Sequence, residues 1–128
     1  MDLEQTRAAV AAARERATDR WARLAGPSTC RLDGPDAQRL AAKEAEGAVQ
    51  ALRLAGRHLD GDGRDREGRD GEGDSDDPAT RLERARREWL TTPAGRGPAA
   101  EAYRAGGTDA LDRIVEQVDQ AGCGRRTL

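Results

Sequence analysis

The chain has 128 residues and nearly balanced charges, with 22 basic and 24 acidic side chains and a net charge of −2. Leu, Ile, Val and Phe together number only 16 of the 128 residues. This fraction lies below the roughly 20% typical of chains that build a large core. A net charge close to zero argues against complete disorder, which needs low hydropathy and high net charge together. Composition therefore argues against a large hydrophobic domain and against a fully disordered chain, and it favours a small helical protein with a thin core.

Residues 3–25 are predicted to form the first helix. Its apolar residues recur at spacings of three and four, which is typical of a single helix face, and the rest of its surface is charged. Gly26-Pro27 follows this stripe and predicts the end of the helix, because glycine closes helices and proline cannot continue them. The stripe consists of Leu3, Thr6, Val10, Ala13, Ala17, Trp21 and Leu24.

A second helix is predicted over residues 35–59, after a connecting loop. It starts with Pro35 and Asp36, which suit a first helical turn. Its apolar face is mostly alanine, so another helix can approach it closely, but each residue buries little area. The heptad-like spacing of both helices predicts side-by-side packing, and residues 1–59 are therefore expected to form a long antiparallel hairpin.

Residues 60–77 form an acidic stretch rich in Gly, Asp and Arg, with nine acidic and three basic side chains. A helix–loop–helix calcium site needs oxygen ligands at alternate loop positions and a bidentate Glu at the last one. In the best register, which starts at Asp70, the last position is Arg81, a cation where a carboxylate is required. The stretch has no large apolar residue to bury, so we predict a disordered linker that lets the flanking parts move relative to each other.

Residues 78–128 are predicted to form a smaller helical lobe. Asp77-Pro78 is typical of an N-cap and first turn, and a short helix should follow as far as Leu90. The segment 91–97 breaks this helix.

The last part of the lobe is expected to contain two helical pieces. Residues 98–107 should form one or two turns that close at Gly106-Gly107, and Thr108 should cap a final helix that ends at Gly122. No segment has the alternating pattern of a strand, so the predicted fold class is all-α.

The sequence contains no catalytic or cofactor-binding motif that we recognise. His58 is the only histidine, which excludes a metal site with two histidine ligands. Because it lies near a helix end, an interaction with the helix dipole is a better explanation of this residue than catalysis. Cys30 and Cys123 lie far apart and outside metal-type spacing, and whether they pair is left open. No enzyme activity, cofactor, metal or small-molecule substrate is predicted. Without an apolar run of spanning length or a signal-peptide pattern, we expect a cytoplasmic protein that does not enter a membrane.

Protein–protein interaction is the predicted function. A thin core gains stability from a protein partner or from homo-oligomerisation, so we expect a non-catalytic adaptor, accessory subunit or regulator. The two apolar stripes are the candidate binding surfaces, unless they pack on each other and form the core. They are represented by Leu3, Val10, Trp21, Leu24, Leu111, Ile114, Val115 and Val118.

The alternative prediction is association with nucleic acid. Four arginines crowd one short helix and could neutralise phosphates. The weak basic charge of the lobe and the scarcity of aromatic residues argue against this alternative. The candidate residues are Arg81, Arg84, Arg86 and Arg87.

Overall fold

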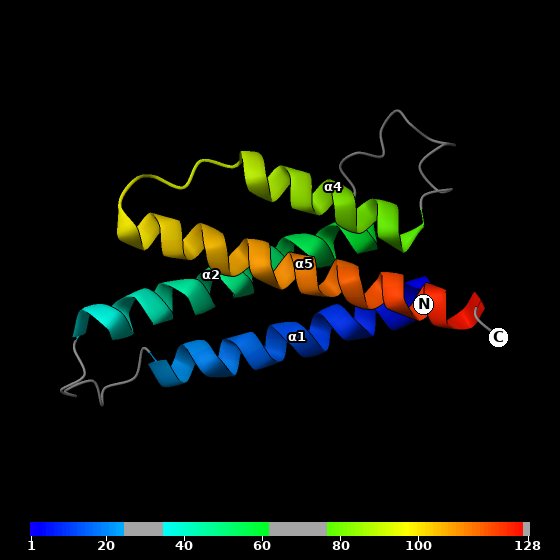
Figure 1. Cartoon of the computed structure of the whole chain (residues 1–128), viewed down its shortest axis with the longest axis horizontal. Coiled ribbons are helices and arrows are strands. Elements are labelled where there is room, and N and C mark those ends of the chain that lie inside the picture. The colour runs from blue at the N-terminus through cyan, green and yellow to red at the C-terminus, as the bar shows by residue number, and fades with distance from the viewer. Residues whose placement is uncertain (25–34, 62–76, 127–128) are drawn as a thin grey trace.

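The computed structural model describes residues 1–24, 35–61 and 77–126, and every element within them is an α-helix (Figure 1). The all-α prediction is therefore confirmed for this part of the chain. The predicted disordered linker and the segment considered for calcium binding fall mostly on residues 62–76, outside the described residues. The helices are α1 (Leu3–Leu24), α2 (Pro35–Asp60), α4 (Pro78–Thr91) and α5 (Pro98–Arg126).

Helix α2 lies at the centre of the arrangement and contacts each of the other three helices. Helix α1 runs beside it in the opposite direction, and α5 crosses it at an angle (Figure 1). Helix α4 covers α2 and α5 together, whereas α1 and α5 touch only slightly. An alanine-rich helix can serve as this central element because its small side chains let neighbours approach from several sides.

All four helices contribute to one hydrophobic cluster. The helices before and after residues 62–76 therefore share a core in the folded chain. The division into lobes 1–59 and 78–128 stays a prediction about how the parts fold and move. The buried members of the cluster are Val10, Ala51, Leu52, Leu54, Ala55, Leu59, Leu82, Ala85, Trp89, Leu111, Ile114 and Val118.

The predicted helix break at Gly106-Gly107 is wrong, because α5 continues through both residues without interruption. A methyl group on Gly106 would collide with the backbone carbonyl of Glu44 in α2, and one on Gly47 would collide with the carbonyl of Tyr103. Gly107 faces the indole ring of Trp89 in the same way. These glycines therefore allow the close approach of helices, and the cost of glycine in a helix interior is outweighed by packing.

Arginine side chains donate hydrogen bonds to the carboxyl-terminal ends of two helices, where carbonyl groups lack partners within the helix. At the end of α2, Nη1 of Arg81 donates to the carbonyl oxygens of His58 at 3.3 Å and Leu59 at 2.8 Å. At the end of α4, the guanidinium of Arg104 donates to three carbonyls, the shortest contact being 2.6 Å to Thr92. Each arginine thus ties one helix to the end of another.

The predicted N-cap at Asp77 is confirmed. Its side chain accepts a hydrogen bond from the backbone N–H of Thr80 at 3.0 Å, and Pro78 occupies the first helical position. Hydrogen bonding from Thr80, through its side chain first and its backbone N–H second, lowers the pKa of the Asp77 carboxyl. The ionised form therefore caps the helix more strongly than the protonated form does.

Asp77→Ala should lower the free energy of unfolding near neutral pH by about 1 kcal/mol, the typical loss for a removed N-cap. Because the folded-state pKa lies below its ordinary value, the stabilisation by the charge is present above that value and is lost as pH falls through the folded pKa. Chemical denaturation at neutral pH and below about pH 3 tests this. Asp77→Asn keeps a hydrogen-bond acceptor but has no charge, so its free energy of unfolding should differ less between the two pH values than that of wild type. The same pH dependence in Asp77→Asn as in wild type would contradict the assignment.

Candidate functional site

The predicted binding stripe of α5 lies mainly in the core of the same chain. Leu111, Ile114 and Val118 are buried, and Val115 is half-buried and packs against the cluster. A partner cannot reach the three buried side chains while this fold persists. Helix α5 packs chiefly on α2 and only slightly on α1, so the two predicted stripes contribute to a core that all four helices share and do not form it by packing on each other alone.

The predicted stripe of α1 is only partly covered. Val10 is buried, and Leu3 is half-buried against the core cluster. Trp21 and Leu24 are also half-buried, but within the described residues neither belongs to the cluster nor packs against it. These two side chains are the part of the predicted surface that is incompletely buried and does not contribute to the core cluster.

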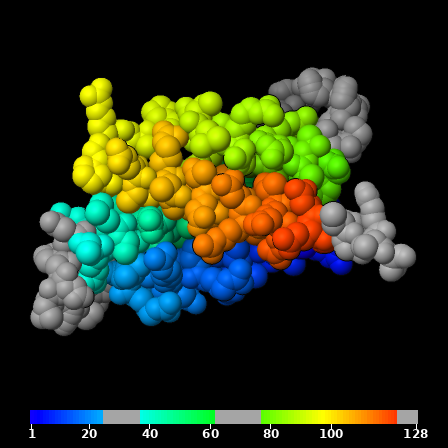
Figure 2. Space-filling model, in the orientation of Figure 1, coloured from blue at the N-terminus to red at the C-terminus, as the bar shows by residue number. Residues whose placement is uncertain are grey.

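The burial of α1 decreases along its length. Thr6 and Val10 are its only buried residues, and no residue from position 11 to position 24 is buried. The space-filling view shows α1 along one edge of the molecule, bordered by the start of α2 and by α5 (Figure 2). Most stability of a protein helix comes from the packing of its apolar face, so the second half of α1 has little of this support.

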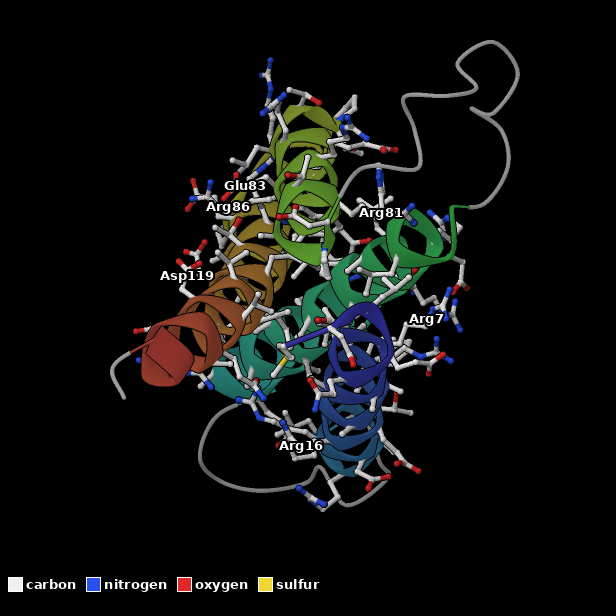
Figure 3. The ribbon with its side chains drawn as sticks, turned by 90° about the vertical axis from the view of Figure 1, so that its right-hand side faces the viewer. Arg7, Arg16, Arg81, Glu83, Arg86 and Asp119 are labelled. Carbon is white, nitrogen blue, oxygen red and sulfur yellow. The ribbon has the colours of Figure 1, made fainter. Side chains whose placement is uncertain are left out.

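The arginines predicted to bind nucleic acid are largely engaged within the chain. Arg81 holds the end of α2, and Nε of Arg86 lies 2.7 Å from Oδ1 of Asp112, which raises the pKa of the Arg86 guanidinium (Figure 3). Arg84 also has an intramolecular interaction, and Arg84 and Arg87 are exposed. The four side chains therefore do not form one free basic surface. The prediction of nucleic-acid binding through this helix stays untested.

His58 lies in the last turn of α2, as predicted, where the helix dipole interacts favourably with positive charge. Its Nε2 atom lies 2.8 Å from Oε1 of Glu88 on α4, so the imidazole links these two helices. Among residues 1–24, 35–61 and 77–126, no group of three or more His, Cys, Asp or Glu side chains could hold a metal ion. The pairing of Cys30 and Cys123 lies outside the described side chains.

An aromatic pair marks the contact between α4 and α5. The rings of Trp89 and Tyr103 are tilted, with centroids 5.4 Å apart, and the Trp89 indole N–H donates to the carbonyl of Arg104 at 3.2 Å. Burial raises the pKa of the Tyr103 hydroxyl, and the charge of Glu46 adds to this shift. Tyr103 is therefore neutral at physiological pH, and the pair acts as a packing element between helices.

No protein-family model, no curated protein and no solved structure matches this chain. Its function must be argued from its own side chains. In the part of the chain that the structure describes, none of the helices combines the length and apolar character that crossing a bilayer requires.

A basic flank on α1 was missed by reading the sequence. Arg16, Arg20 and Arg23 lie at spacings of four and three and are all exposed. Residues with these spacings share one side of a helix, so the signal was present in the sequence. It was hidden because arginine is spread over the whole chain, with 21 copies.

Proposed function

We propose that the protein is a non-catalytic helical interaction protein that binds a partner through the second half of α1. The observation that supports this is the incomplete burial of Trp21 and Leu24, which lie outside the core cluster on a helix with only two buried residues. Full burial of a large apolar side chain stabilises by about 1.5–3 kcal/mol, and part of this is still unrealised at both positions. A partner helix that covers them would stabilise α1 and gain affinity from the same contact.

Tryptophan is well suited to be the centre of such a contact, because interface hot spots are enriched in tryptophan and arginine. Trp21 has three arginines close to it in sequence: Arg16, Arg20 and Arg23. Within the described residues, Leu90 on α4 is the large apolar side chain that is exposed, at 43%; it also has arginines close to it in sequence, but one of them, Arg86, pairs with Asp112. Because Trp21 lies outside the core cluster, a substitution there should separate binding from folding.

Trp21→Ser should weaken capture of the partner about 30-fold, equivalent to about 2 kcal/mol, without changing the fold. The experiment compares tagged full-length protein with Trp21→Ser and Leu90→Ser in nuclease-treated lysate of the source organism. Far-UV circular dichroism and a thermal melt establish that each variant is folded. A stoichiometric protein that wild type and Leu90→Ser retain, and that Trp21→Ser loses, supports the proposal.

Retention of the same partner by Trp21→Ser would exclude the second half of α1 as the binding surface. The molar mass of the purified protein from light scattering identifies the partner as a second copy when wild type is dimeric and Trp21→Ser is monomeric. The proposal also fails when only nucleic acid co-purifies and no protein survives nuclease treatment.

A further inference from the structure

We infer that the partner of this surface is an acidic amphipathic helix, and this inference rests on the proposed function. Its apolar face would cover Trp21 and Leu24, and its carboxylates would pair with the basic flank formed by Arg16, Arg20 and Arg23. Helix-in-groove recognition uses this combination of apolar anchors and charged edges. The inference assigns a chemical class to the partner.

The basic flank has no partner within the described residues. Arg16, Arg20 and Arg23 are exposed, and none of them makes an ion pair or hydrogen bond through its side chain in this part of the chain. Arg16 extends from the side of α1 opposite to Arg7, whose Nε lies 3.0 Å from Oδ1 of Asp60 (Figure 3). The two flanks of α1 are therefore used differently, one within the fold and one not.

Several arginines of the other helices have partners within the fold. Arg81 and Arg104 donate to backbone carbonyls, and Arg86 and Arg113 pair with carboxylates, so the arginines of α4 and α5 contribute widely to the fold. The flank on α1 instead places like charges one turn apart, an arrangement that destabilises a helix. Carboxylates from a partner would remove this repulsion beside Trp21 and Leu24, the large apolar side chains of α1 that do not pack against the core cluster.

An acidic helix fits this surface better than a nucleic acid does. The flank supplies only three arginines, Asp19 lies between two of them and Glu15 directly precedes the first in sequence, and the whole chain carries a net charge of −2. Phosphate binding gains affinity from the number of neutralised charges, and interspersed carboxylates reduce it. A helical partner with separate apolar and acidic faces can place its carboxylates beside arginines while its apolar face covers Trp21 and Leu24.

The test uses defined probes and the full-length chain. Two labelled synthetic helices share one leucine face, and their other positions are glutamate in one and lysine in the other. A labelled single-stranded oligonucleotide is the third probe. Fluorescence anisotropy at low ionic strength should show binding of the glutamate helix, no binding of the lysine helix, and no binding of the oligonucleotide.

The triple variant Arg16→Gln, Arg20→Gln, Arg23→Gln should bind the glutamate helix at least about tenfold more weakly. Its matched control neutralises three other exposed arginines, Arg53, Arg57 and Arg87, which are not on α1, and should bind like wild type. Equal binding of both synthetic helices, equal binding by the two triple variants, or absence of binding would overturn the inference. Binding of the oligonucleotide without the glutamate helix would assign the flank to nucleic acid instead.

Failure of this inference is distinguishable from failure of the proposed function. When the Arg16, Arg20 and Arg23 variant still captures the lysate partner that Trp21→Ser loses, the interaction surface stands and the acidic class is rejected. When Trp21→Ser retains its lysate partner, the interaction surface is rejected, and the probe titrations still decide whether the flank prefers acidic helices.

Discussion

Gly106→Ala is expected to lower the free energy of unfolding by about 2 kcal/mol or more, although alanine is the better helix former. The added methyl group would collide with the carbonyl of Glu44, which belongs to the backbone of α2 and cannot turn away as a side chain can. Relief requires that α2 and α5 separate, which loosens the most extensive contact between two helices of the molecule. Chemical denaturation followed by far-UV circular dichroism measures the loss.

Gly56→Ala is the matched control, since Gly56 lies within α2, as Gly106 lies within α5, but has open space where the methyl group would be. It should gain about 0.5–1 kcal/mol, because only the helix propensity changes. Gly47→Ala should behave like Gly106→Ala, since its methyl group would meet the carbonyl of Tyr103 from the opposite side of the same crossing. Equal stability of Gly56→Ala and Gly106→Ala would show that the two helices do not approach closely at this point.

Local signals in the sequence predicted the starts of helices correctly where the residues of the first turn themselves determine the start. Pro35 begins α2 and Asp77-Pro78 begins α4, because a proline ring and a short acidic side chain favour the first turn whatever surrounds them. At the start of α1, Asp2 and Gln5 exchange hydrogen bonds of 2.8 and 2.9 Å between side chain and backbone, a reciprocal cap that also lies within four residues. Such interactions need no knowledge of the fold.

Gly106-Gly107 could not be assigned from local propensity, because the decisive neighbours are Glu44 and Trp89, distant in sequence. A pair of glycines between two short helical patterns normally indicates a break. Here the absence of side chains lets two helix backbones meet, and the packing that follows outweighs the entropic cost of ordering glycine. Sequence alone does not distinguish these two uses of glycine.

The same limit applied to the candidate site. Hydrophobic periodicity identified the apolar stripes of α1 and α5, but it could not show that the fold buries Leu111 completely and Trp21 only partly. Arginine chemistry is equally ambiguous, since one guanidinium can bind a phosphate, a carboxylate or the end of a helix. Arg81 was predicted as a candidate for phosphates, and the fold uses it for the carbonyls of α2.

Leu82→Ala is expected to reduce the free energy of unfolding by about 2–5 kcal/mol, because Leu82 is completely buried in the shared cluster and its removal leaves a cavity. Small domains have total stabilities of only about 5–15 kcal/mol, so this loss brings a chain with a thin core close to unfolding. Leu90→Ala on the same helix, at a 43% exposed position, should change stability by less than about 0.5 kcal/mol.

The Leu82 variant also decides whether the parts on either side of residues 62–76 fold as one unit. In a Trp21→Phe background, Trp89 fluorescence reports on α4, while far-UV circular dichroism reports on all helices together. If all helices share one core, both signals should have the same transition midpoint, since different probes coincide in two-state unfolding. In Leu82→Ala, both midpoints should then shift to the same lower denaturant concentration. Independent lobes would give a shift of the Trp89 transition and leave a second transition, that of α1 and α2, unchanged. The cluster that joins Val10, Leu59, Leu82 and Leu111 favours the single transition, because a cavity at Leu82 weakens contacts on both sides of the segment.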